Sequence, residues 1–302
     1  MCPPDPPKTS FSRNVAAKMV ELSSAAYEDV PSPNPIILEG FKLNFTTNPA
    51  TCLLLDVPLF GYIGKSDSKK EIYVAFRGSN FKQIAQQLLV EIFSSGSAAW
   101  PPGFPGVLVG NYFLAGAALV SKCGMTDAIS KIVLDNPTYS VWFTGHSLGG
   151  ALTVLTALDC RLSGIVNQSQ IYTFGQPRIG NGVFANVVDS FLPNLYRVVN
   201  DVDPVPHVPQ CDLTNSDRYS VCQNSSGWNP FHHGKEIWFA CGDYTSCVYR
   251  ECVGKPFGED ISCSDHMTVF QGSIPLTSII NVKEHMVQSY YTVINQFGCI
   301  TK

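Results

Sequence analysis

The sequence predicts an α/β fold in which helices flank a central, mostly parallel sheet. Short runs rich in β-branched and aromatic residues alternate with runs of helical apolar spacing as far as about residue 203. Such alternation requires crossover connections between parallel strands. The composition is that of a globular chain, with 45% hydrophobic residues and a formal net charge of only -4. Because no Pro-, Gly- or Ser-rich linker separates the two halves, we expect residues 1–302 to form one domain.

The individual elements follow from the same patterns, taken from the N-terminus. After a Pro-rich tail at residues 1–10, apolar residues at helical spacing predict a helix over 11–27. Runs of β-branched and aromatic residues between turn formers predict the first three strands. The strands and helices expected in order are strands at 52–57, 61–64 and 71–76, helices at 81–93 and 112–134, a strand at 140–143, a helix at 148–160, a strand at 170–174, a helix at 182–191, a strand at 195–199 and a helix at 282–296.

The cysteines indicate disulfides rather than a metal site or a redox pair. Seven of the eleven cysteines lie after residue 210, and no C-x-x-C occurs, which argues against a zinc ribbon and a thioredoxin-like pair. We therefore expect a disulfide-rich loop insertion over residues 211–263, before the C-terminal helix. An odd number of cysteines leaves at least one thiol unpaired, and Cys160, on the helix expected at 148–160, is the candidate.

Disulfides and glycosylation sequons predict secretion into an oxidising compartment. Three acceptor triplets begin at Asn44, Asn167 and Asn224, so we expect a glycoprotein. No basic-then-apolar start is visible in the first residues, and we interpret the chain as a mature form without its signal peptide.

Charge and hydropathy exclude two classes of partner. Lys and Arg together number 20 against 24 Asp and Glu, with no basic run, which argues against a nucleic-acid surface. The apolar runs stop far short of the roughly 20 residues that a membrane-spanning helix needs. No feature of the sequence suggests a protein partner.

Residues 140–152 contain a G-x-S-x-G pattern centred on Ser147. An apolar, β-type run precedes the pattern and a helix-forming run follows it, which is the strand-turn-helix of a nucleophile elbow. Gly145 and Gly149 fit because a strained serine at the apex requires neighbours without Cβ atoms at positions minus two and plus two. The N–H of Leu148, at the start of the helix, would then face a developing oxyanion. The alternative interpretation is an ordinary tight turn whose serine caps the helix.

A nucleophilic serine needs a histidine as base and a carboxylate that orients it. Along the chain the acid follows the elbow and the histidine follows the acid. Asp201 and Asp203 both come after the strand expected at 195–199, and order alone does not choose between them. His146 lies inside the elbow and is expected to point elsewhere. The histidines that remain candidates on order alone are His207, His232, His233, His266 and His285.

Four motifs in the same order resemble the fungal-type triacylglycerol lipases, the class 3 lipases, over roughly residues 70 to 295. They are FRGS at 76–79, GHSLGGAL at 145–152, FGQPRIGN at 174–181 and YRVVNDVDPVPHVP at 196–209. The resemblance implies an α/β-hydrolase fold. It selects Asp203 as the acid, because Asn200, Asp203 and the Val-Pro after it match the family's N-x-x-D-x-V-P segment. His285, followed by two tyrosines on the last helix, resembles the family's catalytic histidine, and His266 is its rival.

The resemblance also assigns an oxyanion hole and a lid. It implies that Ser79 supplies a backbone N–H and a hydroxyl, beside the N–H of Leu148. Residues 80–93 align with the family's lid, a short amphipathic helix over the serine; a plain core helix fits the same periodicity. His233, in a further segment that resembles the family, is expected to be structural.

The expected function is therefore that of a secreted serine ester hydrolase, a triacylglycerol lipase that uses Ser147, His285 and Asp203. Its substrate would be a lipid or a small ester at a lipid–water interface, and it would need neither a metal nor an organic cofactor. A phospholipase or a feruloyl-type carboxylesterase on the same fold is the alternative. A non-catalytic lipid carrier that kept the pocket is an alternative from another class.

Overall fold

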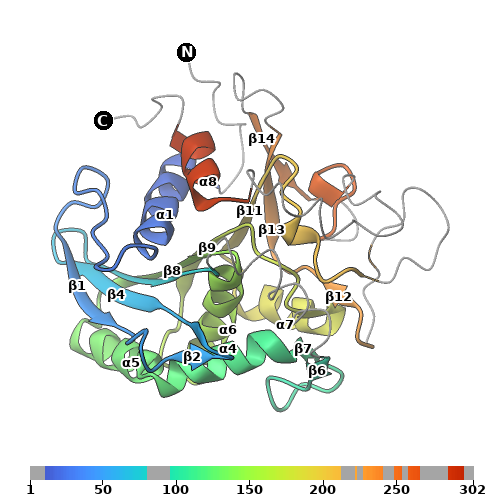
Figure 1. Cartoon of the computed structure of the whole chain (residues 1–302), viewed down its shortest axis with the longest axis horizontal. Helices are drawn as coiled ribbons and strands as arrows, with labels where there is room; N and C mark the ends of the chain where they lie inside the picture. The colour runs from blue at the N-terminus through green and yellow to red at the C-terminus, as the bar shows by residue number, and fades with distance from the viewer. Residues whose placement is uncertain are drawn as a thin grey trace.

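A computed structural model describes residues 11–79, 96–211, 222, 227–240, 248–253, 258–265 and 285–295. The described residues contain an eight-stranded sheet in the order β1-β4-β5-β8-β9-β11-β13-β14 (Figure 1). Its strands are β1 Phe41–Thr46, β4 Gly61–Ser66, β5 Glu71–Phe76, β8 Ser140–His146, β9 Ser169–Phe174, β11 Leu195–Asn200, β13 Lys235–Ala240 and β14 Val248–Cys252.

The centre of this sheet is parallel and its two margins are antiparallel. The strands from β5 through β8, β9 and β11 to β13 pair in parallel. β1 and β4 at one margin, and β14 at the other, run antiparallel to their neighbours. The expected mostly parallel sheet is confirmed, and the carboxyl ends of its central strands meet along one edge.

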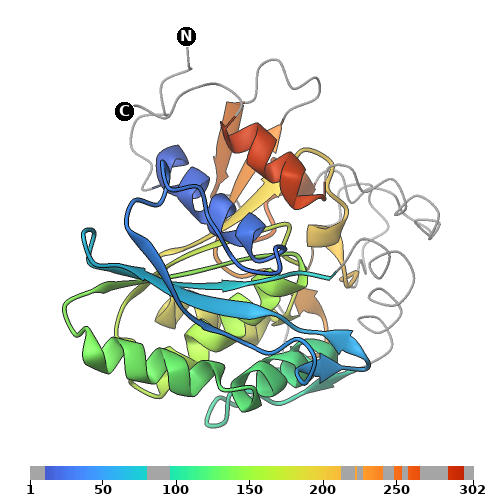
Figure 2. The ribbon, with the colours of Figure 1, turned by 60° about the vertical axis from the view of Figure 1, so that its left-hand side comes forward.

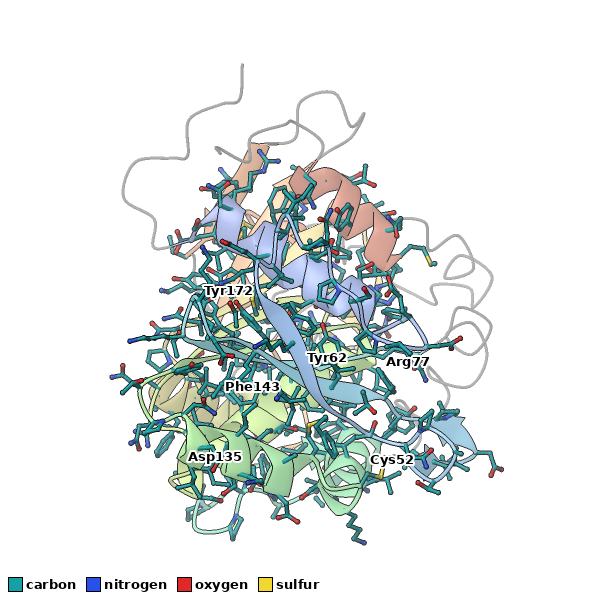
Figure 3. The ribbon with its side chains drawn as sticks, turned by 90° about the vertical axis from the view of Figure 1, so that its left-hand side faces the viewer. Cys52, Tyr62, Arg77, Asp135, Phe143 and Tyr172 are labelled. Carbon is teal, nitrogen blue, oxygen red and sulfur yellow. A yellow bond between two sulfur atoms is a disulfide. The ribbon has the colours of Figure 1, made fainter. Side chains whose placement is uncertain are left out.

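Helices cover both faces of the sheet (Figures 1 and 2). They are α1 Arg13–Ala25, α4 Asn111–Lys122, α5 Met125–Asp135, α6 Leu148–Leu162, α7 Gly182–Phe191 and α8 Val287–Asn295. α1 and α8 lie side by side on one face, where Tyr172 belongs to their apolar core. α4, α5, α6 and α7 cover the other face, whose core includes Phe143 (Figure 3). None of the described helices is long and apolar enough to cross a membrane.

Shorter elements complete the described structure. A second sheet has the order β12-β10-β7-β6, and β2 pairs with β3 in a hairpin just before β4. Their bounds are β2 Leu53–Leu54, β3 Val57–Pro58, β6 Ser97–Ala98, β7 Val109–Gly110, β10 Gly180–Asn181, β12 Pro230–Phe231 and the 3-10 turn η2 Val205–His207. The strand expected at 52–57 is thus the start of a hairpin, because Leu55 and Asp56 adopt positive φ (47° and 64°) and reverse the chain.

The single helix expected at 112–134 is wrong, since the structure divides it into α4 and α5. Gly124 stands between the two helices with φ +92°, the left-handed conformation that ends helices and that glycine adopts without a Cβ clash. The preceding residue, Cys123, forms a disulfide with Cys52 in the segment before the β2–β3 hairpin. The apolar spacing continues through the break, which is why periodicity alone did not detect it.

Residues 211–263 are more than a loop insertion. Within the described part of this segment, β13 pairs in parallel with β11 and β14 pairs with β13, so both strands extend the main sheet. Disulfides join Cys211 to Cys222 and Cys252 to Cys263. Cys160 is free and buried on α6, as expected.

Other predictions fall partly beyond the described residues. The helix expected at 81–93, the lid expected at 80–93, His266 and the sequon at Asn224 all lie outside them. Asn44 and Asn167, the asparagines of the other two sequons, are exposed.

Candidate active site

Ser147 sits at the sharp turn between β8 and α6. Its φ of 58° and ψ of -128° are strained for a residue with a side chain, and the side chain is fully buried. The Ser147 N–H donates to the carbonyl of Phe174 at the end of β9 (2.9 Å), so the turn is held against the neighbouring strand. This is the strand-turn-helix geometry that the sequence predicts.

The two flanking glycines let the backbone close around the turn. A Cβ on Gly145 would lie 2.2 Å from the carbonyl oxygen of Gly149, and a Cβ on Gly149 would lie 2.2 Å from that of Phe76. Neither contact is sterically tolerable, so each position requires glycine. The second contact also brings α6 against the end of β5.

His285 links Ser147 to Asp203. Its Nε2 lies 2.9 Å from Ser147 Oγ, and its Nδ1 lies 2.9 Å and 3.1 Å from the two carboxylate oxygens of Asp203. All three side chains are fully buried. These distances are within hydrogen-bond reach, which is the geometry that a serine, a base and an orienting acid require. Ser147, His285 and Asp203 are called the triad below.

Asp203 is held by neutral donors as well as by His285. The N–H of Val205 donates to one carboxylate oxygen (2.9 Å) and the hydroxyl of Tyr290 donates to the other. Burial alone would raise the pKa of Asp203, but the charge and hydrogen bond of His285, with these two donors, outweigh it and leave the pKa lowered. The carboxylate therefore stays ionised although it is buried.

Gly175 and Tyr290 complete the surroundings of Asp203. A Cβ on Gly175, whose φ is 59°, would lie 2.8 Å from the Asp203 carboxylate and 2.9 Å from His285 Nδ1, so a side chain here would displace the pair. Burial raises the pKa of Tyr290 well above its ordinary value, which keeps its hydroxyl protonated as a donor. The sequence singled out the tyrosine pair at 290–291, but only as a marker for His285.

The other candidates on chain order are placed elsewhere or outside the described residues. The carbonyl of Asp201 accepts a hydrogen bond from Trp238 Nε1 (3.0 Å). His232 Nε2 lies 2.5 Å from the carbonyl oxygen of Pro206, and His233 Nε2 lies 3.0 Å from Gln176 Nε2. These contacts tie neighbouring segments together. His233 thus sits in a packed interior position.

The loop after β5 brings Ser79 to the turn at Ser147. Gly78 packs so tightly there that a Cβ on it would lie 2.6 Å from the carbonyl oxygen of His146 and 2.8 Å from Ser147 Cβ. The Ser79 hydroxyl is buried and has no hydrogen-bond partner among the described residues. Leu148 is the first residue of α6, so its N–H has no acceptor in a preceding helical turn. Ser79, which follows Gly78, and Leu148, which follows Ser147, are therefore both close to the turn at Ser147.

His146 does not simply point away from the site. Its Nε2 lies 2.6 Å from the backbone carbonyl oxygen of His285, and its Nδ1 lies 2.7 Å from the hydroxyl of Tyr27. Burial and the nearby His285 lower the pKa of His146 to about 3, so the ring is neutral. Sequence reasoning missed both His146 and Tyr27, because only the folded chain brings residue 27 to the elbow.

A second buried polar assembly, the arginine cluster, contacts the segment that follows Asp203. It consists of Arg178, Arg197, Glu236, Glu259 and Asp265, all of them buried. Arg178 Nε and Nη2 make a bidentate pair with Glu259, each nitrogen 2.8 Å from one oxygen. Burial and the carboxylate of Asp265 raise the pKa of Glu259 to about 7, although Arg178 opposes them.

The arginine cluster also holds backbone. Arg178 Nη1 donates to the carbonyls of His207 (2.6 Å) and Pro209 (3.2 Å), in the segment that follows Asp203. Arg197 donates to the carbonyls of His233 (2.6 Å) and Gly258 (2.7 Å). Glu236 lies near the sulfurs of Cys252 and Cys263, but these form a disulfide and offer no thiolate to a metal.

Comparisons with known proteins agree on one family. The family model for class 3 lipases matches residues 73–213. A lipase of Caenorhabditis elegans is 34% identical over 288 residues, covering 88% of this chain and 77% of the relative. A secreted mono- and diacylglycerol lipase of Fusarium solani is 34% identical over 197 residues, covering 64% of this chain and 52% of the relative. The chain spans about half the length of the curated fungal relatives that it matches.

The solved structures include lipase II from Rhizopus niveus. It is 26% identical to this chain, superimposes with a TM-score of 0.68, and the match covers 92% of this chain and 94% of that one. The expected fold class, an α/β-hydrolase fold with a central, mostly parallel sheet, is thereby confirmed.

Proposed function

The chain belongs to the class 3 lipase family, and on that premise we propose that it is a secreted serine ester hydrolase that cleaves acylglycerol esters. Ser147 would be the nucleophile, His285 the base and Asp203 the residue that orients His285. The N–H groups of Ser79 and Leu148 would form the oxyanion hole.

One observation carries the proposal: a buried, strained serine lies 2.9 Å from His285 Nε2, whose Nδ1 lies 2.9 Å from a buried carboxylate. A serine hydroxyl is a weak nucleophile without such a base. A helix-capping serine, the alternative interpretation of this turn, would bond to its own helix, but Ser147 makes no side-chain capping bond.

The proposed reaction follows acyl transfer through a serine ester. Ser147 Oγ attacks the ester carbonyl while His285 Nε2 takes its proton, and the protonated His285 then gives that proton to the leaving alcohol. Water, activated by the same nitrogen, then attacks the acyl-serine and releases the fatty acid. Asp203 holds His285 in the tautomer whose Nε2 accepts, because its carboxylate occupies the Nδ1–H.

The negative charge on the carbonyl oxygen would be stabilised by preorganised donors. The N–H of Leu148 stands at the positive end of α6, and Ser79 adds a second N–H and a hydroxyl that no other group in the described part of the chain binds. Each donor of this type contributes on the order of 3 kcal/mol to transition-state stabilisation. No step requires a metal or an organic cofactor.

Secretion and a lipid substrate are inferences from the relatives and the cysteines. One relative is named as a secreted mono- and diacylglycerol lipase. Three disulfides among the described residues fit an oxidising compartment. The lid expected at 80–93 would explain activity at a lipid–water interface.

The test is hydrolysis of a short-chain and a long-chain triglyceride, each assayed below and above its solubility limit, with a phospholipid in parallel. We expect Ser147→Ala to lose about 10⁴-fold or more in kcat without loss of thermal stability. Ser163→Ala, the same change at the exposed far end of α6, is the matched control and should retain full activity.

The outcomes separate the candidate functions. A rate increase on the emulsion that disappears with Ser147→Ala would support the lipase and the lid at 80–93. Turnover of soluble short esters alone would keep the triad and indicate a carboxylesterase, and a preference for the phospholipid would indicate a phospholipase. Substantial turnover by Ser147→Ala would refute the assignment. No turnover, together with no labelling by a serine-reactive phosphonate, would favour the lipid carrier.

A further inference from the structure

Two backbone groups near Ser147, one at the end of a strand and one before a helix, form hydrogen bonds with side chains instead of with the backbone. The first is the N–H of Gly78. At the end of β5 the N–H of Arg77 still donates to the backbone of the neighbouring strand segment (2.9 Å). The N–H of Gly78 donates instead to the hydroxyl of Tyr27 (3.1 Å). Because Ser79 follows directly, Tyr27 holds the backbone immediately before a proposed oxyanion donor.

The second group is the carbonyl of His285. The N–H groups of Ser289 and Tyr290 both donate to the carbonyl of Met286, so the first turn of α8 leaves the carbonyl of His285 without a helical donor. His285 is fully buried, and a buried carbonyl without a donor costs free energy. The ring of His146 supplies the donor, with Nε2 at 2.6 Å.

The direction of each hydrogen bond follows from chemistry. A carbonyl oxygen can only accept, so the proton of the His146 ring is on Nε2. The ring is neutral, so Nδ1 has no proton and accepts from the hydroxyl of Tyr27 (2.7 Å). The oxygen of Tyr27 is then free to accept from Gly78. The order is Gly78 N–H to Tyr27, Tyr27 to His146, and His146 to the carbonyl of His285.

We propose that Tyr27 and His146 are positioning residues that join the backbone of the catalytic base to the backbone of the oxyanion loop through this one chain of hydrogen bonds, called the relay below. The proposal deepens the function proposed above and rests on it. In this role, neither residue would need to touch the substrate. The relay would keep the backbone of His285 and that of Gly78, directly before Ser79, at the spacing that attack on a carbonyl requires.

Packing around the relay supports this role. The ring of His146 packs against the ring of His285 in a tilted arrangement, with centroids 4.7 Å apart and planes 33° apart. Tyr27 follows the end of α1, and α1 packs against both α8 and β8. α1 and α8 lie side by side on one face of the sheet (Figure 2). Tyr27, the middle residue of the relay, is therefore attached to a helix that contacts both the helix after His285 and the strand before Ser147.

The test compares two Tyr→Phe changes. Tyr27→Phe removes only the hydroxyl on which the relay depends. Tyr62→Phe is the matched control, since the Tyr62 hydroxyl is buried and donates to the backbone carbonyl of Leu22 (2.8 Å), which is not part of the relay. With a short-chain glyceride below its solubility limit, we expect Tyr27→Phe to lower kcat about 10- to 100-fold with little change in KM. Tyr62→Phe should leave both unchanged.

A double-mutant cycle tests whether the two residues act as one unit. His146→Gln keeps an amide donor near the carbonyl of His285 and should retain more activity than His146→Phe. If both residues act through the relay, Tyr27→Phe combined with His146→Phe should lose about as much kcat as the worse single change. Losses that multiply, or equal activity of His146→Gln and His146→Phe, would overturn the proposal.

Failure of the relay can be told apart from failure of the proposed function. An active wild type, an inactive Ser147→Ala and a Tyr27→Phe as active as Tyr62→Phe would overturn the relay alone. Turnover by Ser147→Ala, or none by the wild type, would overturn the function and the relay with it. If Tyr27→Phe does not fold, the comparison of His146→Gln with His146→Phe decides.

Discussion

Two buried polar assemblies meet at the segment that follows β11, and they are built on opposite plans. On one side, the triad holds a single ionised carboxylate, Asp203, among neutral donors. On the other side, the arginine cluster packs acidic and basic side chains against each other, with Arg178 donating to Glu259 and to the carbonyls of His207 and Pro209.

Because of this difference, we expect one assembly to determine the catalytic rate and the other to determine the stability of the fold. In the triad, His285 takes up and returns a proton during the proposed reaction while Asp203 holds its ring, so this assembly carries the catalytic steps. In the arginine cluster, the buried arginines and carboxyl groups are partners in the resting fold, and a buried ion without its partner is strongly destabilising. Changes in the triad should therefore appear in kcat, and changes in the arginine cluster should appear in the free energy of unfolding.

The largest effect expected is that of Asp203→Asn on catalysis. The amide cannot stabilise a protonated His285 and favours the wrong tautomer, so kcat should fall about 10⁴-fold with little loss of stability. Ester hydrolysis and chemical denaturation of the same samples measure both quantities. Asp201→Asn, two residues away, is the control and should lose far less activity. A similar loss in both variants would reopen the choice of acid.

The next effect is that of Arg178→Met on stability. Removing this arginine leaves the Glu259 and Asp265 carboxyls without it in a buried site, so the free energy of unfolding should fall by about 3–5 kcal/mol. Urea denaturation measures the change, and Arg161→Met at the half-buried end of α6 is the matched control. Combining Arg178→Met with Glu259→Leu should recover part of the loss. If the double variant is less stable than the single one, the arginine cluster is not a coupled unit.

The smallest of these effects concerns pH. The pKa of His146 is lowered to about 3 by burial and by His285, against an ordinary value of 6.5, so between these values only the unfolded chain binds the proton. Stability from this residue is therefore complete above pH 6.5 and is lost as the pH falls toward 3. From pH 7 to pH 5 the wild type should lose about 2 kcal/mol more than His146→Gln. Denaturation curves at the two pH values test this, and equal losses would contradict it.

Much of the fold and of the candidate site could be predicted because the signals are local. The strand, turn and helix around Ser147 follow one another without interruption from residue 140 to residue 162, and the glycine requirement follows from the backbone alone. β13 was missed because Glu236, which is buried in the arginine cluster, looks like a solvent-exposed residue in the sequence. β1 was missed because most of its residues are polar or exposed.

The arginine cluster and the relay were missed because both depend on contacts between segments that are distant in the sequence. Arg178 and Glu259 are 81 residues apart, and Tyr27 and His146 are 119 apart. No spacing rule connects such pairs; only the arrangement of strands around the central sheet does. Chain order likewise left five histidines open, and the choice of His285 came from the resemblance to the lipases.

The free Cys160 has a consequence for oxidative folding. Disulfides rearrange when a thiolate attacks an existing bond, and burial on α6 raises the pKa of the Cys160 thiol to about 12. Once α6 has packed, this sulfur is withdrawn from exchange, and an even number of cysteines remains to pair. The odd cysteine therefore need not scramble the others, and the chain can be oxidised after its core has formed.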